Sequence, residues 1–485
     1  MNSAYTRLDD DSESEKGRPT SCVTLVVVLA CLTVLGIVLA IVVLERPSPS
    51  KDETFPEEDE WNTTDQCSMV LVESIPQHVK YKANATFGLP LEKAWKDLIS
   101  MATHQVDVVS FYWTLTGDDI GVNSSSDLPG RQILKALEEL PSRNISVRLL
   151  SSVPSVQTNS SDFKILKEKG VQVRRVNFGR LTRGVLHSKF WIVDRKHVFI
   201  GSANMDWRAL TQVKELGVVV HNCSSLAKDL HKIFQSYWVM GEPNSTLPQP
   251  WPAAYDTVIN KEHPLMVKTG NVSSFIYLAA SPPPFCPPSR TQDLEAILSI
   301  ISDAQRFVDV AVMEYFPTIR FEKPHRYWSF LDDAIRTTAF EKGVKIRMLL
   351  SCGRDSDPTM LPFLQSLASV DSPHHGINIQ IKIYIVPVGN QSDIPYSRVN
   401  HNKYMVTDKV AYIGTSNWSG DYFVTTAGVG LVISQHAPHP VWKTEALQSQ
   451  LKAVFDRDWN SEFAVHLDDL KHHPDCALSR EQKLL

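Results

Sequence analysis

Two stretches of the chain carry the same polar residues at the same spacing. Residues 185–204 read VLHSKFWIVDRKHVFIGSAN, and residues 401–417 read HNKYMVTDKVAYIGTSN. The matching pairs are His187 and His401, Lys189 and Lys403, Asp194 and Asp408, Gly201 and Gly414, Ser202 and Thr415, and Asn204 and Asn417. Core packing explains the apolar alternation of each stretch, but it gives no reason for the same polar groups to occur twice. The repeat therefore indicates that both sets take part in chemistry.

These residue types suit the cleavage of a phosphodiester without a metal ion. The lysines supply positive charge, and the side chains of Ser202, Asn204, Thr415 and Asn417 donate hydrogen bonds to non-bridging phosphate oxygens. One neutral imidazole can attack phosphorus and form a phosphohistidine, while a second, protonated imidazole donates to the leaving oxygen. No carboxylate cluster has the spacing of a two-metal nuclease and no Cys/His cluster indicates zinc, so we expect no metal and no cofactor.

The elements around the two motifs are also duplicated. Helix-period segments and apolar strands occur in the same order in both halves of the chain. The matching segments begin at Leu91 and Leu294, at Ile145 and Val344, and at Val171 and Ile379. This alternation predicts an α/β fold of two similar lobes, related by internal duplication, each a mixed sheet flanked by helices. We expect the first lobe to span residues 67–270 and the second to span residues 271–485.

The amino-terminal part of the chain predicts a membrane anchor. Residues 22–44 carry no charge and are long enough to cross a bilayer as one helix, which makes an uncleaved signal anchor the expectation. Residues 1–21 would then form a cytosolic tail, in which the YTRL sequence at residues 5–8 has the form of an endolysosomal sorting signal. Residues 45–66 are acidic and poor in apolar side chains, so we expect a stalk.

Glycosylation sequons indicate the orientation of the anchor. Besides the triplet at Asn417, nine N-x-S/T triplets follow residues 22–44, and none precedes them. They begin at Asn62, Asn84, Asn123, Asn144, Asn159, Asn222, Asn244, Asn271 and Asn390. This density predicts a lumenal body that passes through the endoplasmic reticulum and Golgi, and hence a single-pass type II membrane protein. Asn417 also begins a sequon, but its motif position predicts burial and no modification.

Basic and aromatic residues near the motifs are candidates for substrate contact. The net charge of −5 argues against bulk attraction to nucleic acid, so a polyanion site has to be a local patch. Four arginines that precede the first motif could form such a patch: Arg174, Arg175, Arg180 and Arg183. Four aromatic residues could stack on a base, although buried aromatic residues mostly belong to the core: Trp207, Trp418, Tyr112 and Trp113.

The paired H-x-K-x4-D motifs, each followed by G-[ST]-x-N, resemble the HKD signature of the phospholipase D superfamily. The resemblance extends from about Cys67 to Cys476. The segments GVLHSKFW, GSANMDWRALTQVKELG and YIGTSNWSGDYF, together with the anchor, are similar to the animal lysosomal branch that contains family members three and four. The resemblance implies 5′-to-3′ exonuclease activity on single-stranded DNA and RNA in the endolysosomal lumen. The same branch has also been linked to transphosphatidylation of lysosomal phospholipid.

The resemblance also implies a role for each residue of the motifs. It makes His187 the nucleophile and His401 the general acid, which then becomes the general base. Glu215 aligns with Thr426, so only the first half keeps a carboxylate that could orient and activate its histidine. Asp194 and Asp408 are included in the catalytic set, where we expect them to brace the motifs without touching substrate.

The cysteines predict two disulfides. Two of the seven cysteines lie in the anchor, and the other five would meet an oxidising compartment. Pairing within each half, together with the resemblance, predicts bridges between Cys67 and Cys223 and between Cys352 and Cys476. Cys286 would then be a free thiol.

Two other functions stay open at the level of sequence. The same chemistry permits a phospholipase or transphosphatidylase that acts on phospholipid head groups, which the anchor could bring to lipid. An inactive lumenal binding protein is the alternative from another class, and the intact paired motifs argue against it. The sequence also leaves open whether the chain forms a homodimer and whether the lumenal body is released in soluble form.

Overall fold

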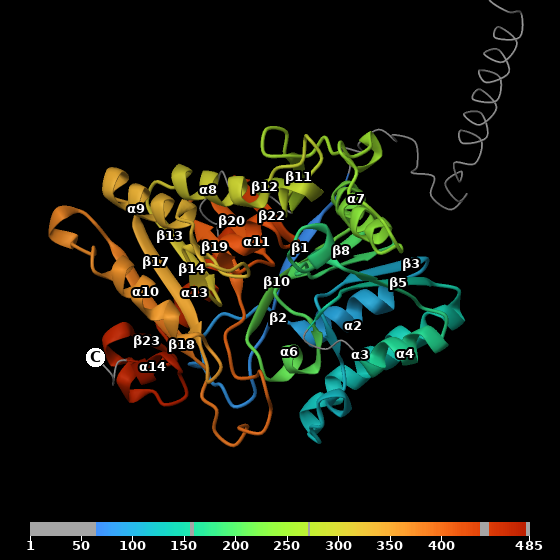
Figure 1. Ribbon diagram of the computed structural model, residues 1–485, viewed down its shortest axis with the longest axis horizontal. Helices are drawn as coiled ribbons and strands as arrows, with labels where there is room; N and C mark the ends of the chain where they lie inside the picture. Colours follow the sequence, from blue (N-terminus) through green and yellow to red (C-terminus); the bar gives the residue numbers. More distant parts are fainter. Residues whose placement is uncertain (1–64, 156–159, 270–271, 437–445, 482–485) are drawn as a thin grey trace, which may run out of the picture. The chain divides into compact units, whose positions relative to one another are not determined.

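The computed structural model describes residues 65–155, 160–269, 272–436 and 446–481 (Figure 1). The predicted tail and anchor, and all but the last two residues of the predicted stalk, lie outside the described residues. The sequons at Asn62, Asn159 and Asn271 lie outside them as well. Within the described ranges, no helix has the length and apolar character needed to cross a membrane.

The predicted duplication takes the form of two mixed sheets with matching strand orders. The first sheet has the order β2 (Leu89–Pro90), β1 (Ser68–Ser74), β10 (Glu215–His221), β8 (His197–Gly201), β7 (Phe190–Val193), β3 (Gln105–Val109), β5 (Ser146–Ser152) and β6 (Gln172–Val176). The second has the order β11 (Leu265–Thr269), β12 (Val272–Ser281), β22 (Gly428–His436), β20 (Val410–Gly414), β19 (Lys403–Thr407), β13 (Phe307–Val312), β17 (Lys345–Cys352), β18 (Ile379–Ile385) and β23 (Ala464–His466). Because β11 belongs to the second sheet, the second lobe begins before residue 271, the predicted boundary.

Helices cover the two sheets at equivalent places (Figure 1). The longer helices are α2 (Leu91–Met101), α3 (Leu128–Glu139), α4 (Ser161–Glu168), α7 (Ser224–Met240), α8 (Asp293–Asp303), α9 (Phe330–Lys342), α10 (Leu361–Ala368) and α13 (Leu447–Trp459). The shorter ones are α5 (Phe178–Leu181), α6 (Trp207–Thr211), α11 (Gly420–Val424) and α14 (Leu478–Glu481). Three small strand pairs are β4 (Trp113–Thr114) with β9 (Met205–Asp206), β14 (Tyr315–Phe316) with β21 (Trp418–Ser419), and β15 (Thr318–Ile319) with β16 (Arg326–Tyr327).

Local sequence patterns explain the elements that the duplication predicted. In α2 the buried residues are Leu91, Ala94, Trp95, Leu98 and Ile99, which is the spacing of one apolar helix face. In β7 all four residues are buried, as expected for a strand whose two faces are both covered. The segments predicted from matching positions in the two halves form β3 and β13, β5 and β17, and β6 and β18, so these predictions are confirmed.

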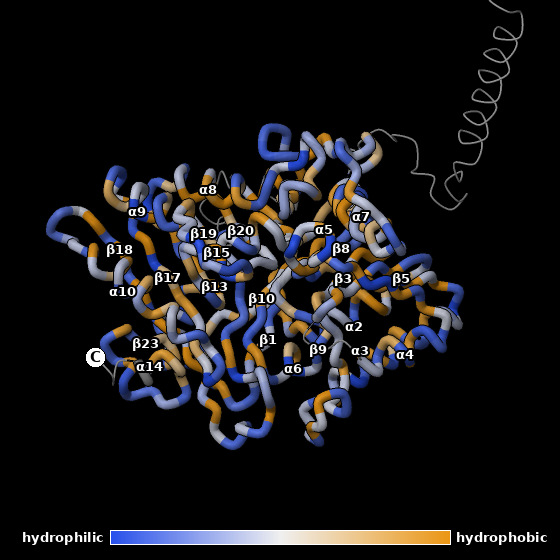
Figure 2. The backbone as a smooth tube through the Cα atoms, viewed as in Figure 1, coloured by the Kyte–Doolittle hydropathy of each residue, from blue (hydrophilic) through white to orange (hydrophobic). Residues whose placement is uncertain are grey.

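Three apolar cores hold these layers together. One contains residues of α2, α3 and α4 with the first sheet, and another contains residues of α8, α9 and α10 with the second sheet. The third core includes residues of α7, α13 and both sheets, so the two lobes share it. Figure 2 shows apolar residues concentrated along the strands and hydrophilic residues along the outer loops.

The two predicted disulfides are present. Cys67, just before β1, is bonded to Cys223 at the start of α7, and Cys352 at the end of β17 is bonded to Cys476. Cys286 is free, as predicted. Its thiol donates to the Ala280 carbonyl over 3.3 Å, and burial raises its pKa to about 12, so it stays protonated near neutral pH.

A buried ion pair joins the lobes away from the motifs. The Arg290 guanidinium donates to both carboxylate oxygens of Asp229 on α7, over 2.6 and 2.7 Å, and both side chains are almost fully buried. Two parallel hydrogen bonds fix the angle between the partners as well as their distance. The pair therefore sets the relative position of α7 and the segment that follows β12.

Arg290→Met should lower the free energy of unfolding by about 3–5 kcal/mol, because it leaves the Asp229 carboxylate buried and unpaired. Urea denaturation of the variant measures this loss. The double variant Arg290→Met/Asp229→Leu should recover most of it, since no buried charge remains. A double variant as unstable as the single one would show that the loss comes from packing.

Candidate active site

Each motif histidine is bound by the other motif. Nδ1 of His187 lies 2.8 Å from the carbonyl oxygen of Thr415, and Nδ1 of His401 lies 3.0 and 2.9 Å from the two carboxylate oxygens of Glu215. His187 is 6% exposed and the His401 side chain 15% exposed. The structure therefore brings the two predicted motifs together into one composite site between the lobes.

The backbone repeats this exchange. The His187 amide donates to the Ala427 carbonyl over 3.0 Å, and the His401 amide donates to the Lys214 carbonyl over 2.8 Å. The residue before each histidine is held by a serine at the end of a neighbouring strand: Ser152 accepts from Leu186 and Ser351 accepts from Asn400. These serines and the cross-lobe pairing fix both histidine loops. The sequence analysis did not identify the serines, although their equivalent places in the repeat were a usable signal.

Glu215 has a different partner from the predicted one. We predicted that Glu215 orients His187, but its carboxylate lies on His401 of the other lobe, so that prediction was wrong. The predicted alignment of Glu215 with Thr426 was also wrong. Gly217 pairs with Gly201 and Gly430 pairs with Gly414, so the equivalent of Glu215, two residues earlier, is Gly428 and not Thr426.

Gly428 has no room for a carboxylate. A Cβ at this position would lie 2.2 Å from the Ser416 hydroxyl oxygen and 2.9 Å from the Ser281 hydroxyl oxygen. The polar atoms beneath it are thus packed against bare backbone. Only one of the two histidines can therefore have a carboxylate partner of this kind, and that histidine is His401.

These partners define the protonation of each ring. A carbonyl oxygen accepts but cannot donate, so neutral His187 carries its proton on Nδ1 and its lone pair on Nε2. A carboxylate next to Nδ1 of His401 stabilises the imidazolium, which keeps a proton on Nε2 as well. The first ring is suited to attack and the second to donate a proton.

Electrostatics separate the two histidines further. Burial, with contributions from Lys189, Lys403 and His401, holds the pKa of His187 well below its usual value. Burial also lowers the pKa of His401, but Glu215 opposes this effect both by charge and by hydrogen bonding. His187 is therefore the more readily neutral of the two.

The two motif lysines lie beside the histidines. Lys189 donates to the His187 carbonyl over 2.5 Å, and Lys403 donates to the His401 carbonyl over 2.8 Å. Burial lowers the pKa of Lys403 to about 8 and that of Lys189 well below its usual value. A bound phosphate would stabilise both ammonium groups, because it adds negative charge beside them.

Two of the predicted phosphate donors, Ser202 and Asn417, are hydrogen-bonded to carboxylates. The Ser202 hydroxyl donates to Glu215 over 2.5 Å, so a contact with the carboxylate replaces its predicted phosphate contact. The Asn417 amide donates to Glu314 and to the Tyr422 hydroxyl, both over 3.2 Å. For Asn204, Thr415 and Asn417, phosphate binding stays a prediction. Glu314, which the sequence analysis missed, adds a carboxylate whose pKa is raised by burial.

Asp194 and Asp408 lie at the far ends of their strands from the histidines. Asp194 follows β7 and accepts hydrogen bonds from the backbone amides of residues 103–105 and from the Thr103 hydroxyl, over 2.7 to 2.8 Å. Asp408 follows β19 and accepts two backbone hydrogen bonds, from Gln305 and Arg306. A strand of four or five residues, roughly 13–17 Å long, separates each aspartate from its histidine. Both brace the fold, as expected, so their place in the catalytic set was wrong.

The predicted aromatic contacts belong to the core. Trp113 and Trp207 are fully buried and Trp418 is 3% exposed, so none of these rings offers a face to substrate. Tyr112 is partly buried and its hydroxyl donates to Asp206 over 2.8 Å. The sequence analysis missed the rings that do surround His187. Phe111 and Tyr422 lie 5.3 and 5.0 Å from it between ring centroids, and Phe321, 52% exposed, lies 5.8 Å from Tyr422.

Three of the predicted basic residues have protein partners. Arg174 pairs with Glu242, Arg180 donates to Ser245, and Arg183 lies 3.7 Å from Glu322. Arg175 differs, because two of its buried guanidinium nitrogens have no hydrogen-bond partner. Within the described residues, one group of metal-ligand side chains comes together, Asp65 with Cys67 and Cys223, and its sulfurs are in a disulfide.

The predicted sequons that the structure describes are exposed: Asn84, Asn123, Asn144, Asn222, Asn244 and Asn390. Asn417 is 4% exposed, which agrees with its predicted burial. Whether any of these asparagines carries a glycan stays a prediction.

Comparison with known proteins agrees with this geometry. A family model described as PLD3/4, PLD-like domain matches residues 82–389. The chain is 51% identical over 412 residues to human 5'-3' exonuclease PLD4, a match that covers 85% of this chain and 81% of that protein. It is 49% identical over 401 residues to 5'-3' exonuclease PLD3 of Xenopus tropicalis, which covers 82% and 81%. The chain belongs to the PLD3/4 family.

One solved structure shows that the PLD3/4 fold extends beyond close relatives. The phosphatidylserine synthase of Haemophilus influenzae Rd KW20 matches with a TM-score of 0.52 at 14% identity, covering 86% of this chain and 92% of that one. At this identity the likeness concerns the fold alone. It agrees with the α/β architecture described above.

Glu215→Gln should move the alkaline limb of the pH–kcat profile to lower pH by about one unit. The alkaline limb falls as His401 loses its proton, and removing the Glu215 charge lowers the pKa at which this happens. Steady-state rates from pH 4 to 8 measure the shift. Glu242→Gln, which removes a surface carboxylate, should leave the limb in place; an unchanged limb in Glu215→Gln would contradict the assigned partner.

Proposed function

We propose that the chain is a phosphodiesterase that degrades single-stranded DNA and RNA from the 5′ end through a phosphohistidine. The relatives named 5'-3' exonuclease support the exonuclease function. One observation carries the chemistry: the two histidines have opposite partners, a carbonyl for His187 and a carboxylate for His401. This difference supplies one nucleophile and one acid in a single buried site.

In the first step Nε2 of His187 attacks phosphorus. A bond forms between this nitrogen and phosphorus, the bond to the leaving oxygen breaks, and His401 gives its Nε2 proton to that oxygen. Lys189 and Lys403 neutralise the charge that grows on the non-bridging oxygens. The products of the step are a nucleoside phosphoryl group on Nε2 of His187, which keeps its other ester bond, the released alcohol and a neutral His401.

In the second step water attacks phosphorus. His401 takes a proton from the water, the phosphorus–nitrogen bond breaks, and His187 leaves with its lone pair on Nε2. The two histidines thus return to their starting states. Glu215 stabilises His401 whenever it is protonated, at the start and at the end of the cycle.

The cellular setting is part of the proposal. Residues 22–44 anchor the chain as a single-pass type II membrane protein, and the enzyme limits nucleic acid in the endolysosomal lumen. The six exposed sequons and the two disulfides support a lumenal body. Action on phospholipid and formation of a homodimer stay open alternatives, and an assay with lipid separates the first from nuclease activity.

Digestion of a single-stranded oligonucleotide with a 5′-hydroxyl end tests the proposed function. The full chain should shorten it from the 5′ end and should release no head group from phosphatidylcholine vesicles. His187→Ala should abolish the covalent intermediate, whereas His401→Ala should still form it from a nucleoside p-nitrophenyl phosphodiester, whose leaving group needs no proton. Mass spectrometry of acid-free quenched reactions detects the adduct. A phosphoryl group on His401 would reverse the two roles, and lipid cleavage without nuclease activity would replace the proposed substrate.

Phe321→Ala should raise KM for single-stranded substrate roughly tenfold and change kcat by less than about threefold, because a base that stacks on the exposed ring loses that contact. Phe321 is 52% exposed beside Tyr422, which contacts His187. Phe340→Ala is the matched control, since Phe340 is 53% exposed on α9. Equal KM values for the two variants would rule out base stacking on Phe321.

A further inference from the structure

A cluster of four buried charges lies on the lobe interface beside Glu215. Lys214 lies 2.9 Å from Asp458 and 3.5 Å from Glu73, and the side chains of Lys214 and Asp458 are both 0% exposed. Arg457 completes the cluster, because it donates to both carboxylate oxygens of Glu73 over 2.7 and 2.8 Å and lies 2.8 Å from Asp458. Two cations thus balance two anions.

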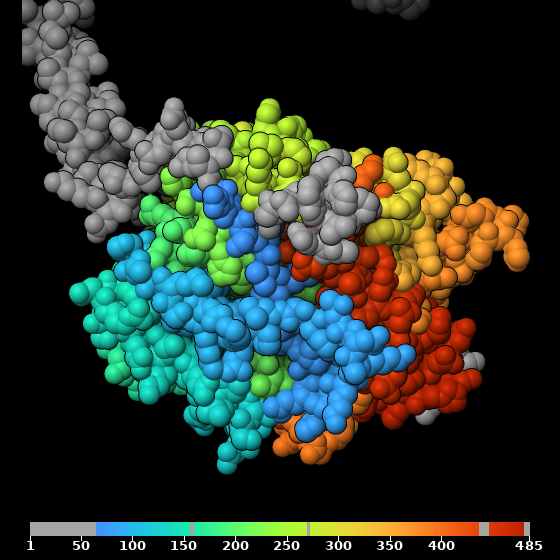
Figure 3. All heavy atoms as spheres, turned by 180° about the vertical axis from the view of Figure 1, so that it is seen from behind, coloured from blue at the N-terminus to red at the C-terminus, as the bar shows by residue number. Residues whose placement is uncertain are grey.

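The cluster joins elements of both lobes. Glu73 lies on β1 and Lys214 immediately precedes β10, both in the first lobe, whereas Arg457 and Asp458 lie on α13 of the second. Figure 3 shows the segment after residue 65, in blue, against the carboxy-terminal segment, in red. A charge that is buried without its partner is unfavourable. The cluster therefore favours the one arrangement of β1, β10 and α13 in which all four charges meet.

Phenol groups complete the surroundings of the cluster. The Tyr81 hydroxyl donates to Asp458 over 2.8 Å and lies 2.5 Å from the Tyr384 hydroxyl. Tyr404 lies close enough for Asp458, Arg457 and Glu73 to influence its ionisation. Burial raises the pKa of all three phenols well above the usual value, so they stay neutral across the working range of pH.

The four equivalent positions in the other half of the fold are uncharged. Arg148 packs over Phe234 and Trp238 as Arg347 packs over Phe455 and Trp459, which fixes the correspondence of α7 and α13. With the strand registers, the equivalents of Glu73, Lys214, Arg457 and Asp458 are Ala280, Ala427, Ser236 and Tyr237. The charged cluster therefore lies behind His401, and it has no counterpart behind His187.

Lys214 connects this cluster to the histidine loop. Its amide donates to the Val399 carbonyl over 3.0 Å, and its carbonyl accepts from the His401 amide over 2.8 Å. The next residue, Glu215, holds Nδ1 of His401. The Lys214 side chain is thus paired with α13, and its backbone is hydrogen-bonded to Val399 and His401 in the histidine loop.

We propose that Lys214 is a positioning residue for the general acid: its buried ion pair with Asp458 fixes the start of β10, and this places Glu215 against His401. The inference rests on the proposed function and adds a residue that does not touch substrate. The charged groups that influence His401 are Glu215, Lys189 and Lys403, and its own charge acts on His187. Of these, Glu215 alone raises the pKa of His401. Moving Glu215 away from His401 therefore lowers that pKa.

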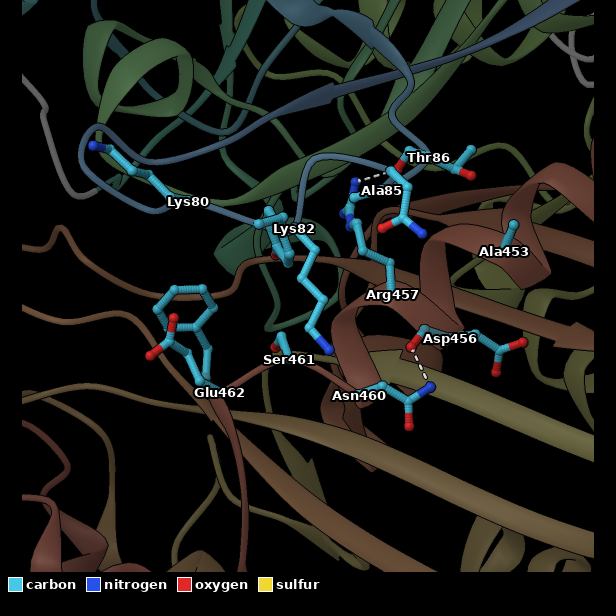
Figure 4. Close-up of a pocket in the computed structure, with 13 residues that line it drawn as sticks. Lys80, Lys82, Ala85, Thr86, Ala453, Asp456, Arg457, Asn460, Ser461 and Glu462 are labelled. Atoms are coloured by element: carbon cyan, nitrogen blue, oxygen red, sulfur yellow. Dashed lines mark hydrogen bonds between the residues drawn. The ribbon is translucent and has the colours of Figure 1, made fainter.

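A pocket lies on the outer side of the cluster. It has a volume of about 450 Å³, and its lining includes Tyr81, Thr86 and Arg457 (Figure 4). Arg457 donates to the Thr86 carbonyl there, over 2.9 Å. Arg457 and Tyr81 thus border solvent, whereas Lys214 and Asp458 have no exposed surface, so the decisive substitutions are at these two buried positions.

The double variant Lys214→Met/Asp458→Asn tests the proposal in the full chain. It removes one cation and one anion, so the net charge of the cluster does not change and the effect on His401 comes from geometry. We expect kcat on a single-stranded oligonucleotide to fall at least tenfold with KM changed less than threefold, and the alkaline limb of the pH–kcat profile to move to lower pH. The burst of p-nitrophenolate from a nucleoside p-nitrophenyl phosphodiester, which reports formation of the intermediate and needs no acid, should keep a rate within twofold of wild type.

Arg347→Met/Asp309→Asn is the matched control, because it removes a buried Arg–Asp pair of the second lobe, with side chains 11% and 0% exposed. It should lower the melting temperature and leave the pH profile unchanged. If the double variant does not fold, the single variants Lys214→Arg and Asp458→Asn test the proposal instead. The arginine variant should keep the wild-type pH profile, and the asparagine variant should shift it. An unshifted profile in folded variants, or an equal loss with both substrates, would overturn the proposal, whereas an inactive wild-type chain would contradict the proposed function instead.

Discussion

The site depends on the hydrogen bond between Glu215 of the first lobe and His401 of the second. It distinguishes two histidines that the duplication would otherwise make equal. With the carboxylate on one side only, His401 can keep a proton while His187 is neutral, and the reaction requires both states at once. The other contacts of the site support this bond: Ser202 holds the carboxylate and the paired backbone segments hold the histidine loop.

The fold provides this bond through an imperfect duplication. Two sheets with matching strand orders bring two H-x-K motifs to one interface, which supplies two imidazoles and two lysines from a repeated sequence. Repetition alone would give two identical environments. At the decisive position one half has Glu215 and the other has Gly428, where no side chain fits. The buried charges around Lys214 come from both lobes and lie next to Glu215, so the asymmetry extends from the reacting groups into the core.

Much of this structure could be predicted from the sequence, because duplication makes local patterns reliable. A segment that reads as a strand in both halves forms one in both, as β5 and β17 show, and pairing within each half, together with the family resemblance, predicted both disulfides. The spacing of His187 and Lys189 was informative for the same reason.

What the sequence did not predict depends on contacts between the halves. Alignment places Glu215 beside its own motif, whereas the cross-lobe pairing places it on His401. Trp207 and Trp418 follow the motifs directly and invited a role in stacking, but both rings are buried beneath the site. Phe321 comes from a segment with no motif. It lies beside the site because its ring packs against Tyr422, which contacts His187 of the other lobe. Each of these placements follows from packing between elements that are distant in sequence.

In the proposed mechanism, Glu215 makes His401 the proton carrier and leaves His187 neutral. A titration of the imidazole nitrogens by 15N nuclear magnetic resonance in the full chain tests it most directly, with His187→Ala and His401→Ala used to assign the signals. The structure predicts a higher pKa for His401 than for His187, and a neutral His187 with its proton on Nδ1. A higher pKa for His187, or a proton on its Nε2 in the neutral state, would contradict the account.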